Sequence, residues 1–132
     1  MHKAKKLFSL LIGCTLSLNA ALAQSADNRK ELSRVDLSGA PGMEVVSSIA
    51  EYQKGQTLSR HFHHGVEAAY VIQGTQIQVP GKDPVTLATG TPVLNLRDVA
   101  HGGYVVVGDV PLKLFTVHIV DKGKPLYDLN VK

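Results

Sequence analysis

The feature that most restricts how this chain can fold is a group of histidine, glutamate and glycine residues between positions 55 and 74. Two histidines separated by one residue, His61 and His63, are followed by Glu67 four residues later. Gly55 and Gly74 flank the group. Imidazole and carboxylate groups are common ligands of divalent transition metals, and three of them fall within seven residues. The spacing therefore predicts a metal site.

The same residues fall on one face of an extended chain. Successive side chains of a β-strand point to opposite faces, so His61 and His63 share a face and their neighbours point away. Gly65 allows the chain to turn, and Glu67 then opens a second strand. Ala69 shares the face of Glu67, and its small side chain would leave space beside a bound metal.

A second segment contributes a further histidine, His101, eleven residues after Gly90. Together the two segments resemble the two conserved motifs of the cupin superfamily, small β-barrels that bind a metal, over roughly residues 43–120. In that family two histidines and one glutamate of the first motif and one histidine of the second hold the metal. The resemblance implies four ligands here, His61, His63, Glu67 and His101.

The second motif is matched only in part. Leu96 stands at its proline, Asp98 at its glycine and Val105 at its final asparagine. The missing proline and glycine put the conformation of the loop before His101 in doubt. The missing asparagine removes a polar group that cupins often have near the site.

Other polar and aromatic side chains are not predicted to be metal ligands. His64 is out of phase with His63 and is expected at the surface or the rim. His118 is expected in the barrel wall, with an indirect role at the site as the alternative. Tyr70 and Tyr104 are out of phase with their nearest ligands, which favours packing or interface contacts. Five further side chains could line a barrel mouth or coat its outside: Gln73, Gln76, Gln78, Asn95 and Arg97.

From residue 43 onward, short apolar or alternating segments are separated by turn signals. No segment after residue 24 keeps the 3.6-residue period of an amphipathic helix. The pattern predicts an all-β fold, and the cupin resemblance implies a single-domain jelly-roll β-barrel, the double-stranded β-helix, over residues 43–132. The expected strands are 43–52, 57–63, 67–73, 75–79, 85–87, 92–96, 103–107 and 112–120.

The chain begins with the pattern of an export signal. A basic start, an apolar run over residues 7–22 and the sequence Ala21-Leu22-Ala23 predict a secretory signal peptide over residues 1–23. Polar residues interrupt the run, which argues against a membrane anchor. Residues 11–14 also resemble a lipobox. We expect a periplasmic or secreted protein that begins at Gln24, with a lipoprotein anchored through Cys14 as the alternative. Residues 24–42 are polar and are expected to form an N-terminal tail or arm that can add an edge strand.

Removal of the signal peptide changes the charge and the cysteine content. Lys3, Lys5 and Lys6 leave with it, so the 14 basic residues fall to eleven, equal to the 11 acidic ones. A neutral chain is a poor partner for nucleic acid or an anionic membrane. The only cysteine, Cys14, also leaves, so the fold must be stable without disulfides. The roughly 110 remaining residues suffice for one small domain.

Three histidines and one carboxylate, without thiolate, suit one divalent transition metal ion, and the candidates are Fe, Mn, Ni, Co, Cu and Zn. An octahedral ion would keep two positions for exchangeable ligands, whereas a tetrahedral zinc bound by all four groups would be structural. The resemblance favours a metal-dependent enzyme on a small organic molecule, with dioxygenase-like oxidoreductase chemistry ahead of isomerase, lyase or decarboxylase chemistry. A non-enzymatic module that binds a metal or a small ligand is the alternative. Glu67 is the one candidate catalytic residue that the sequence places at the site.

Apolar side chains on the face opposite the ligands predict self-association. By strand alternation, Leu58, Phe62, Tyr70 and Ile72 should lie on that outer face. An apolar cluster on a neutral protein suggests a homodimer, as in many cupins.

Overall fold

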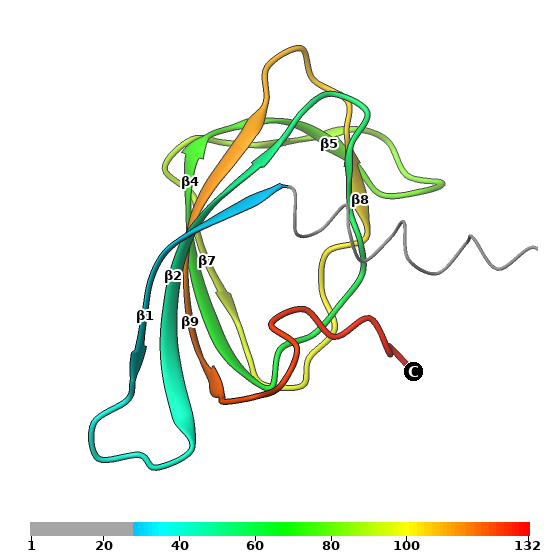
Figure 1. Ribbon diagram of the computed structural model, residues 1–132. Helices are drawn as coiled ribbons and strands as arrows, with labels where there is room; N and C mark the ends of the chain where they lie inside the picture. The colour runs from blue at the N-terminus through cyan, green and yellow to red at the C-terminus, as the bar shows by residue number, and fades with distance from the viewer. Residues whose placement is uncertain (1–27) are drawn as a thin grey trace, which may run out of the picture.

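The computed structural model describes residues 28–132, so the expected signal peptide lies outside the described residues. Two antiparallel sheets face each other across a barrel interior (Figure 1). One sheet has the order β1-β2-β9-β4-β7 and the other the order β3-β8-β5-β6. The strands are β1 (Arg29–Asp36), β2 (Met43–Tyr52), β3 (Thr57–Leu58), β4 (Gly65–Gln73), β5 (Thr75–Gln78), β6 (Val85–Leu87), β7 (Pro92–Asn95), β8 (Tyr104–Val106) and β9 (Leu112–Asp121). The all-β jelly-roll prediction is confirmed. Nowhere in residues 28–132 is there a helix long and apolar enough to cross a membrane.

The long strands β2 and β9 pair along their whole length and form the middle of the larger sheet. Every second side chain of each strand is buried, as expected for a sheet with one face on a core. Val46 pairs with His118 and Ser48 with Thr116, and all four side chains face the interior. Three polar side chains in this buried row, Ser48, Thr116 and His118, show that the interior is more than a hydrophobic core.

The barrel interior has an apolar and a polar part. The apolar part is one cluster of buried side chains, made of Ala50, Tyr52, Val71, Ile77, Val106, Leu112 and Leu114. The polar part consists of buried side chains that can donate or accept hydrogen bonds, including Ser48, His61, His63, Glu67, Thr116 and His118. Buried polar groups are costly unless they find partners, so their concentration in one region indicates a functional site.

The strands follow the sequence pattern closely, with one difference. The strand expected over residues 57–63 ends at Leu58, and beyond it only His61 and Phe62 form isolated bridges. The break resets the side-chain alternation. Leu58 therefore packs against the core and lines an internal cavity, which corrects its predicted place on the outer face. Tyr70 and Ile72 do lie outside, at 52% and 43% exposure.

Segments at both ends of the described chain add to the barrel. β1 belongs to the expected N-terminal arm and pairs with β2 at the edge of the larger sheet. After β9 the chain turns back across one end of the barrel, drawn red in Figure 1. There Asp128 forms a backbone bridge with Phe62, between the two motif histidines. The C-terminal segment therefore lies directly over the predicted metal site.

Candidate metal centre

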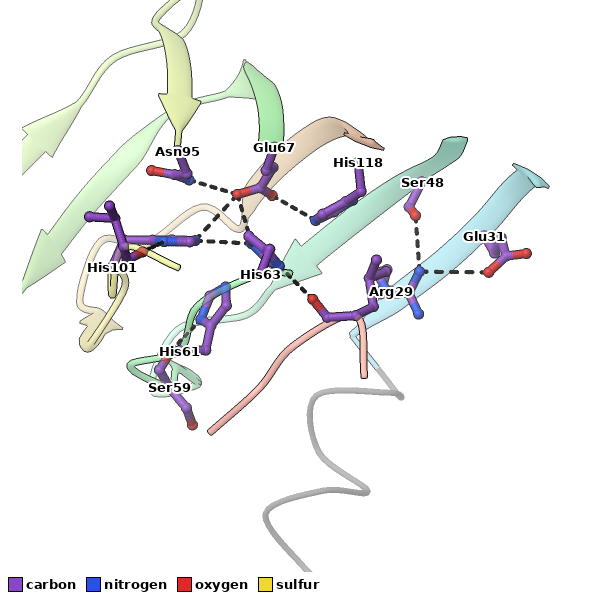
Figure 2. Close-up of polar contacts among 12 residues, drawn as sticks. Arg29, Glu31, Ser48, Ser59, His61, His63, Glu67, Asn95, His101 and His118 are labelled. Carbon is purple, nitrogen blue, oxygen red and sulfur yellow. Dashed lines mark hydrogen bonds and ion pairs between the residues drawn. The ribbon is translucent and has the colours of Figure 1, made fainter. Parts of the chain in front are cut away.

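The structure brings the four predicted ligands together from separate parts of the chain (Figure 2). His61 and His63 lie on the segment between β3 and β4, and Glu67 lies near the start of β4. His101 lies before β8 and forms a backbone bridge with His61. The bridge joins the two motifs and positions His101 beside the other three residues.

The distances between the donor atoms fit a common metal ion. The Nε2 atoms of His63 and His101 are 3.0 Å apart. Glu67 Oε2 lies 3.2 Å from His63 Nε2 and 3.4 Å from His101 Nε2. Ligands that bind one ion at about 2.1 Å are separated by about 3.0 Å at right angles and about 3.4 Å in a tetrahedron. These three atoms are therefore spaced as ligands of one ion.

The rings of His61, His63 and His101 are each oriented by a hydrogen bond at Nδ1. In each ring Nδ1 contacts a backbone carbonyl oxygen, which can only accept a hydrogen bond, so Nδ1 carries the proton. The three contacts are His61 to Ser59 at 2.7 Å, His101 to Val99 at 2.9 Å, and His63 to Leu126. The Nε2 lone pairs consequently face the centre of the group, as in metal sites where outer hydrogen bonds set the tautomer.

Local backbone geometry supports the orientation of His61. Gly102 has a φ of 74° and passes close to the chain at Ser59. A Cβ atom at position 102 would lie 2.7 Å from the Ser59 carbonyl oxygen, which accepts the proton of His61 Nδ1. Glycine at this position therefore allows the close approach that holds the ring.

A bound metal would also satisfy polar atoms that lack partners. The buried His61 Nε2 has no hydrogen-bond partner among the described residues. An unpartnered buried polar atom costs about 1–3 kcal/mol. With Nδ1 protonated in both rings, the Nε2 lone pairs of His63 and His101 lie only 3.0 Å apart and repel each other unless a proton or a metal ion lies between them. The residues present therefore fit a metal ion.

Glu67 is held as an anion by its neighbours. Burial alone would raise its pKa, but contacts with His101, His118 and His63 outweigh burial and lower the pKa well below its usual range. Asn95 donates a hydrogen bond to Glu67 Oε2 at 2.6 Å. Asn95 is one of the side chains whose place the sequence left open, and the β4–β7 register pairs it directly with Glu67.

His118 is closer to the site than its predicted place in the barrel wall. It is fully buried on β9, and its Nε2 lies 3.3 Å from Glu67 Oε1. The donor atoms of His63, Glu67 and His118 all lie within 4.8 Å of one another, as do those of His61, His63 and His101. His118 could therefore act as a fifth ligand. The sequence does carry a signal for this position of His118. It lies an even number of residues from Leu112, Leu114 and Val120 on the same strand, and these three side chains are all buried.

The protonation of the imidazoles differs with their surroundings. Burial lowers the pKa of His61 to about 4, and burial also lowers the pKa of His118. For His101, burial acts to lower the pKa, but contact with Glu67 and the Val99 carbonyl outweighs it and leaves the pKa raised. His61 and His118 are thus neutral, and ready to bind a metal, at neutral pH.

A cavity of about 180 Å³ lies beside the cluster. His61, Glu67, Asn95 and His101 lie on its polar side, and Ala69 leaves space next to Glu67 as the sequence predicts. The remaining wall is made of apolar and tyrosine side chains, which are Tyr52, Leu58, Ile77, Leu87, Val93, Tyr104, Leu114 and Tyr127 together with Gly102. A small molecule in the cavity would reach the predicted ligands.

Comparison of the whole fold with known proteins identifies its architecture. No protein-family model and no curated protein sequence matches this chain. Among solved structures, a protein from Klebsiella pneumoniae with a double-stranded β-helix domain superposes with a TM-score of 0.56 and 15% identity, over 76% of this chain and 82% of that one. The chain has the double-stranded β-helix fold of the cupins.

Two enzymes share this cupin fold at similar distance. The polyketide cyclase RemF from Streptomyces resistomycificus matches with a TM-score of 0.51 and 16% identity, over 80% of this chain and 83% of that one. The DMSP lyase DddQ from Ruegeria pomeroyi matches with a TM-score of 0.52 and 15% identity, over 86% of this chain and 55% of that one. This chain therefore spans about half the length of the lyase.

The altered second cupin motif keeps its turn despite the missing glycine. Asp98 adopts a φ of 59°, which makes it the one described non-glycine residue with positive φ. Aspartate tolerates this left-handed conformation better than most residues. Its backbone N–H donates to the His63 carbonyl at 3.0 Å, and its carboxylate lies 3.7 Å from His64. The doubt about the loop before His101 is thus resolved by a strained but hydrogen-bonded aspartate.

Three more residues outside the predicted ligand set lie near the site: His64 on the rim, and Tyr104 and Tyr127 in the cavity wall. His64 lies on the rim, where its Nε2 is 2.9 Å from Asp128, and it does not face the cluster. Tyr104 does pack, as predicted, but against the cavity and not on an outer face. The reason is that Gly102 and Gly103, both with positive φ, interrupt the alternation after His101. Tyr127 was not predicted at all, because it reaches the site through the C-terminal segment.

Proposed function

We propose that this protein binds one divalent transition metal ion through His61, His63, Glu67 and His101 and acts on a small organic molecule. Dioxygenase-like oxidoreductase chemistry, with dioxygen as co-substrate, is the favoured activity. The observation that carries the proposal is a group of three carbonyl-anchored imidazoles beside a cavity, two of which lie within 3.4 Å of the buried Glu67 carboxylate. When bound, the ion would supply Lewis-acid and, for a redox-active metal, electron-transfer chemistry.

The protonation of the cavity favours redox chemistry over proton transfer. Isomerases, lyases and decarboxylases that work by general acid–base catalysis use a side chain that exchanges protons near neutral pH. Glu67 remains ionised because its contacts lower its pKa. Burial raises the pKa of Tyr52 to about 12 and also raises those of Tyr104 and Tyr127. These four side chains therefore keep one protonation state across the neutral range, which makes Glu67 a better ligand than a catalytic base. His101, whose pKa is raised, is the cavity residue that can exchange a proton when no metal is bound.

A non-enzymatic binding module is the second candidate. His118 could complete a five-donor set with the four predicted ligands. A metal with five protein ligands retains at most one exchangeable position in an octahedron, which suits storage or sensing better than catalysis on a chelating substrate. The lyase and the cyclase with the same fold are enzymes by name, and they favour the first candidate for this chain only by analogy.

Elemental analysis of the purified protein tests the metal site. Glu67→Gln keeps the size of the side chain but removes the anionic donor, so we expect metal affinity to fall at least about tenfold. His64→Ala is the matched control, because His64 lies on the rim and should leave metal content unchanged. Unaltered metal content in Glu67→Gln and in alanine variants of the three histidines would refute the site.

Turnover assays separate the two candidates. The metal-loaded protein is incubated with phenolic and diketone compounds in air and under nitrogen, and product is detected by mass spectrometry. An oxidoreductase that uses dioxygen gives oxygenated product only in air. Binding of these compounds without product in either atmosphere supports the binding module.

We also propose that the mature protein is exported and begins at Gln24. The basic start, the apolar run and the Ala21-Leu22-Ala23 sequence support this. Intact-mass measurement on the processed protein checks the site of cleavage. A diacylated chain that begins at Cys14 would contradict the proposal.

A homodimer is proposed from the outer face of the larger sheet. On that face Tyr70 lies opposite Phe115, and Leu94 lies opposite Ala68. Tyr70, Phe115 and Leu94 are 52%, 37% and 64% exposed, and Ile72 lies beside them on β4. Contiguous apolar side chains on a sheet face are typical of a protein interface.

A further inference from the structure

The composition of the cavity restricts the substrate more than the metal ligands do. Its hydrocarbon wall comes from both sheets, because Ala69, Val93 and Leu114 belong to the larger sheet, and Leu58, Ile77 and Leu87 belong to the smaller one. A wall of this kind gains free energy when it contacts an apolar surface in place of water. Sugars and other polyhydroxylated molecules would leave most of their hydroxyl groups unpaired there.

Three tyrosines give the cavity its remaining polar atoms. Tyr52, Tyr104 and Tyr127 line the cavity, and their hydroxyl groups make no hydrogen bond with another residue in the described part of the chain. Burial raises the pKa of all three phenols. They therefore act as neutral groups that donate or accept single hydrogen bonds.

Among the described residues, the cavity wall contains no lysine or arginine to pair with an anionic substituent. The one anion among these lining residues is Glu67. Two basic groups of the described chain lie near this region. Arg29 has its guanidinium carbon 5.8 Å from the centre of the Tyr127 ring, and the charge of Arg60 acts on the His101 pKa, but Arg60 does not line the cavity. Arg29 does not line the cavity, and its Nη1 atom already donates to Ser48 at 3.1 Å, as Figure 2 shows. A carboxylate or phosphate buried in the cavity would lose its hydration without an ion pair in return.

The volume limits the part of a ligand that the cavity can enclose. An engineered apolar cavity of about 150 Å³ in another protein holds one benzene molecule. The cavity here, at about 180 Å³, holds a six-membered ring with one or two small substituents. Larger polycyclic molecules would extend out of the cavity or require the wall to move.

We infer that the site takes a small chelating molecule with an uncharged, apolar body, of the size of a monocyclic phenol. This inference rests on the proposed metal site. The oxygens of the ligand face the histidine and glutamate cluster, and its ring contacts the wall around Ala69, Val93 and Leu114. Tyrosine hydroxyls bond to at most a few uncharged polar substituents. Molecules with a carboxylate or phosphate away from the chelating oxygens are excluded by the lack of a cation.

Three related probes test the charge requirement on the wild-type protein. Protein loaded with Co(II) is titrated with catechol, 4-methylcatechol and 3,4-dihydroxybenzoate, and binding is followed by the visible absorption of the ion and by calorimetry. The three probes share their chelating oxygens, and the methyl and carboxylate substituents occupy the same ring position. We expect 4-methylcatechol to bind at least as tightly as catechol, and 3,4-dihydroxybenzoate to bind at least about tenfold more weakly. Equal or tighter binding of 3,4-dihydroxybenzoate would overturn the inference.

A matched pair of variants tests whether the ligand lies in this cavity. Ala69→Leu fills space in the cavity wall, and Ala68→Leu adds the same atoms on the exposed face of the same strand. We expect Ala69→Leu to weaken catechol binding at least about tenfold without loss of Co(II), and Ala68→Leu to change neither. Wild-type catechol affinity in Ala69→Leu would overturn the inference, and the probe comparison above decides the matter if that variant fails to fold.

The outcomes separate this inference from the proposed function. If Co(II) binds but neither catechol nor 4-methylcatechol does, the metal site stands and the substrate class is wrong. If the protein binds no Co(II), the proposed metal site is wrong and the inference that rests on it is wrong as well.

Discussion

Acidification of the metal-free protein should destabilise the fold through His61. This side chain is only 1% exposed, and burial lowers its pKa to about 4 from an ordinary value of 6.5. Between these values the unfolded chain binds a proton at His61 that the folded chain does not, so stability falls as the pH falls. The stabilisation is fully present above pH 6.5 and is lost as the pH approaches 4. At about 1.4 kcal/mol per pH unit, the loss is about 3 kcal/mol.

Burial also lowers the pKa of His118, so its contribution is lost on acidification like that of His61. Two further groups contribute to the stability curve in different pH ranges. The pKa of His101 is raised, so its contribution is fully present below pH 6.5 and is lost as the pH rises through the folded-state pKa. Glu67 has a lowered pKa, so its contribution is present above the ordinary glutamate pKa and is lost at lower pH. The metal-free protein should therefore be most stable near pH 6.5. A loss of about 3 kcal/mol is a large part of the 5–15 kcal/mol that is typical of a domain.

Urea denaturation of the metal-free protein at a series of pH values between 7 and 4 measures this effect. The wild type should lose about 3 kcal/mol more over this range than His61→Gln, which has no imidazole to protonate. His64→Gln is the control and should keep the loss caused by His61, because His64 lies outside the cavity. NMR titration of the imidazole resonances gives the pKa of His61 directly. Parallel stability curves for wild type and His61→Gln, or a His61 pKa near 6.5, would refute the reasoning.

Further predictions concern the metal, the core, the loop and the assembly. Metal affinity should decrease as the pH falls from 8 to 5 in calorimetric titrations, with His101 the first ligand at which protons compete because its pKa is raised. Leu112→Ala removes a fully buried side chain and should lower the free energy of unfolding by about 2–5 kcal/mol in urea titrations. Asp98→Ala should cost about 1–2 kcal/mol in the same assay and leave metal content unchanged, since alanine tolerates positive φ poorly. Light scattering should show a wild-type dimer that Ile72→Asp converts to a monomer, and a monomeric wild type at micromolar concentration would contradict the proposed interface.

Short-range patterns in the sequence were sufficient to predict most of the strands and to predict that the ligands of the first motif share a face. The two-residue repeat of an extended chain predicts that His61, His63 and Glu67 share a face, and the structure brings all three to the cluster although the strand expected over 57–63 ends at Leu58. The bounds of β2 and β6 follow from apolar runs and turn residues that act within a few positions. His101 needed the resemblance to the second cupin motif, since its bridge to His61 spans forty residues.

The tertiary structure decided which side chains from distant segments complete the site. His118 and Asn95 reach Glu67 through the pairing of β4 with β9 and β7, and no local pattern specifies that register. Tyr127 arrives through the C-terminal segment, and Leu58 turns inward because the strand breaks after it. Alternation predicts a side chain's direction only while the strand continues. The register between strands depends on the packing of the whole barrel, so the residues that meet across strands cannot be predicted from local sequence patterns.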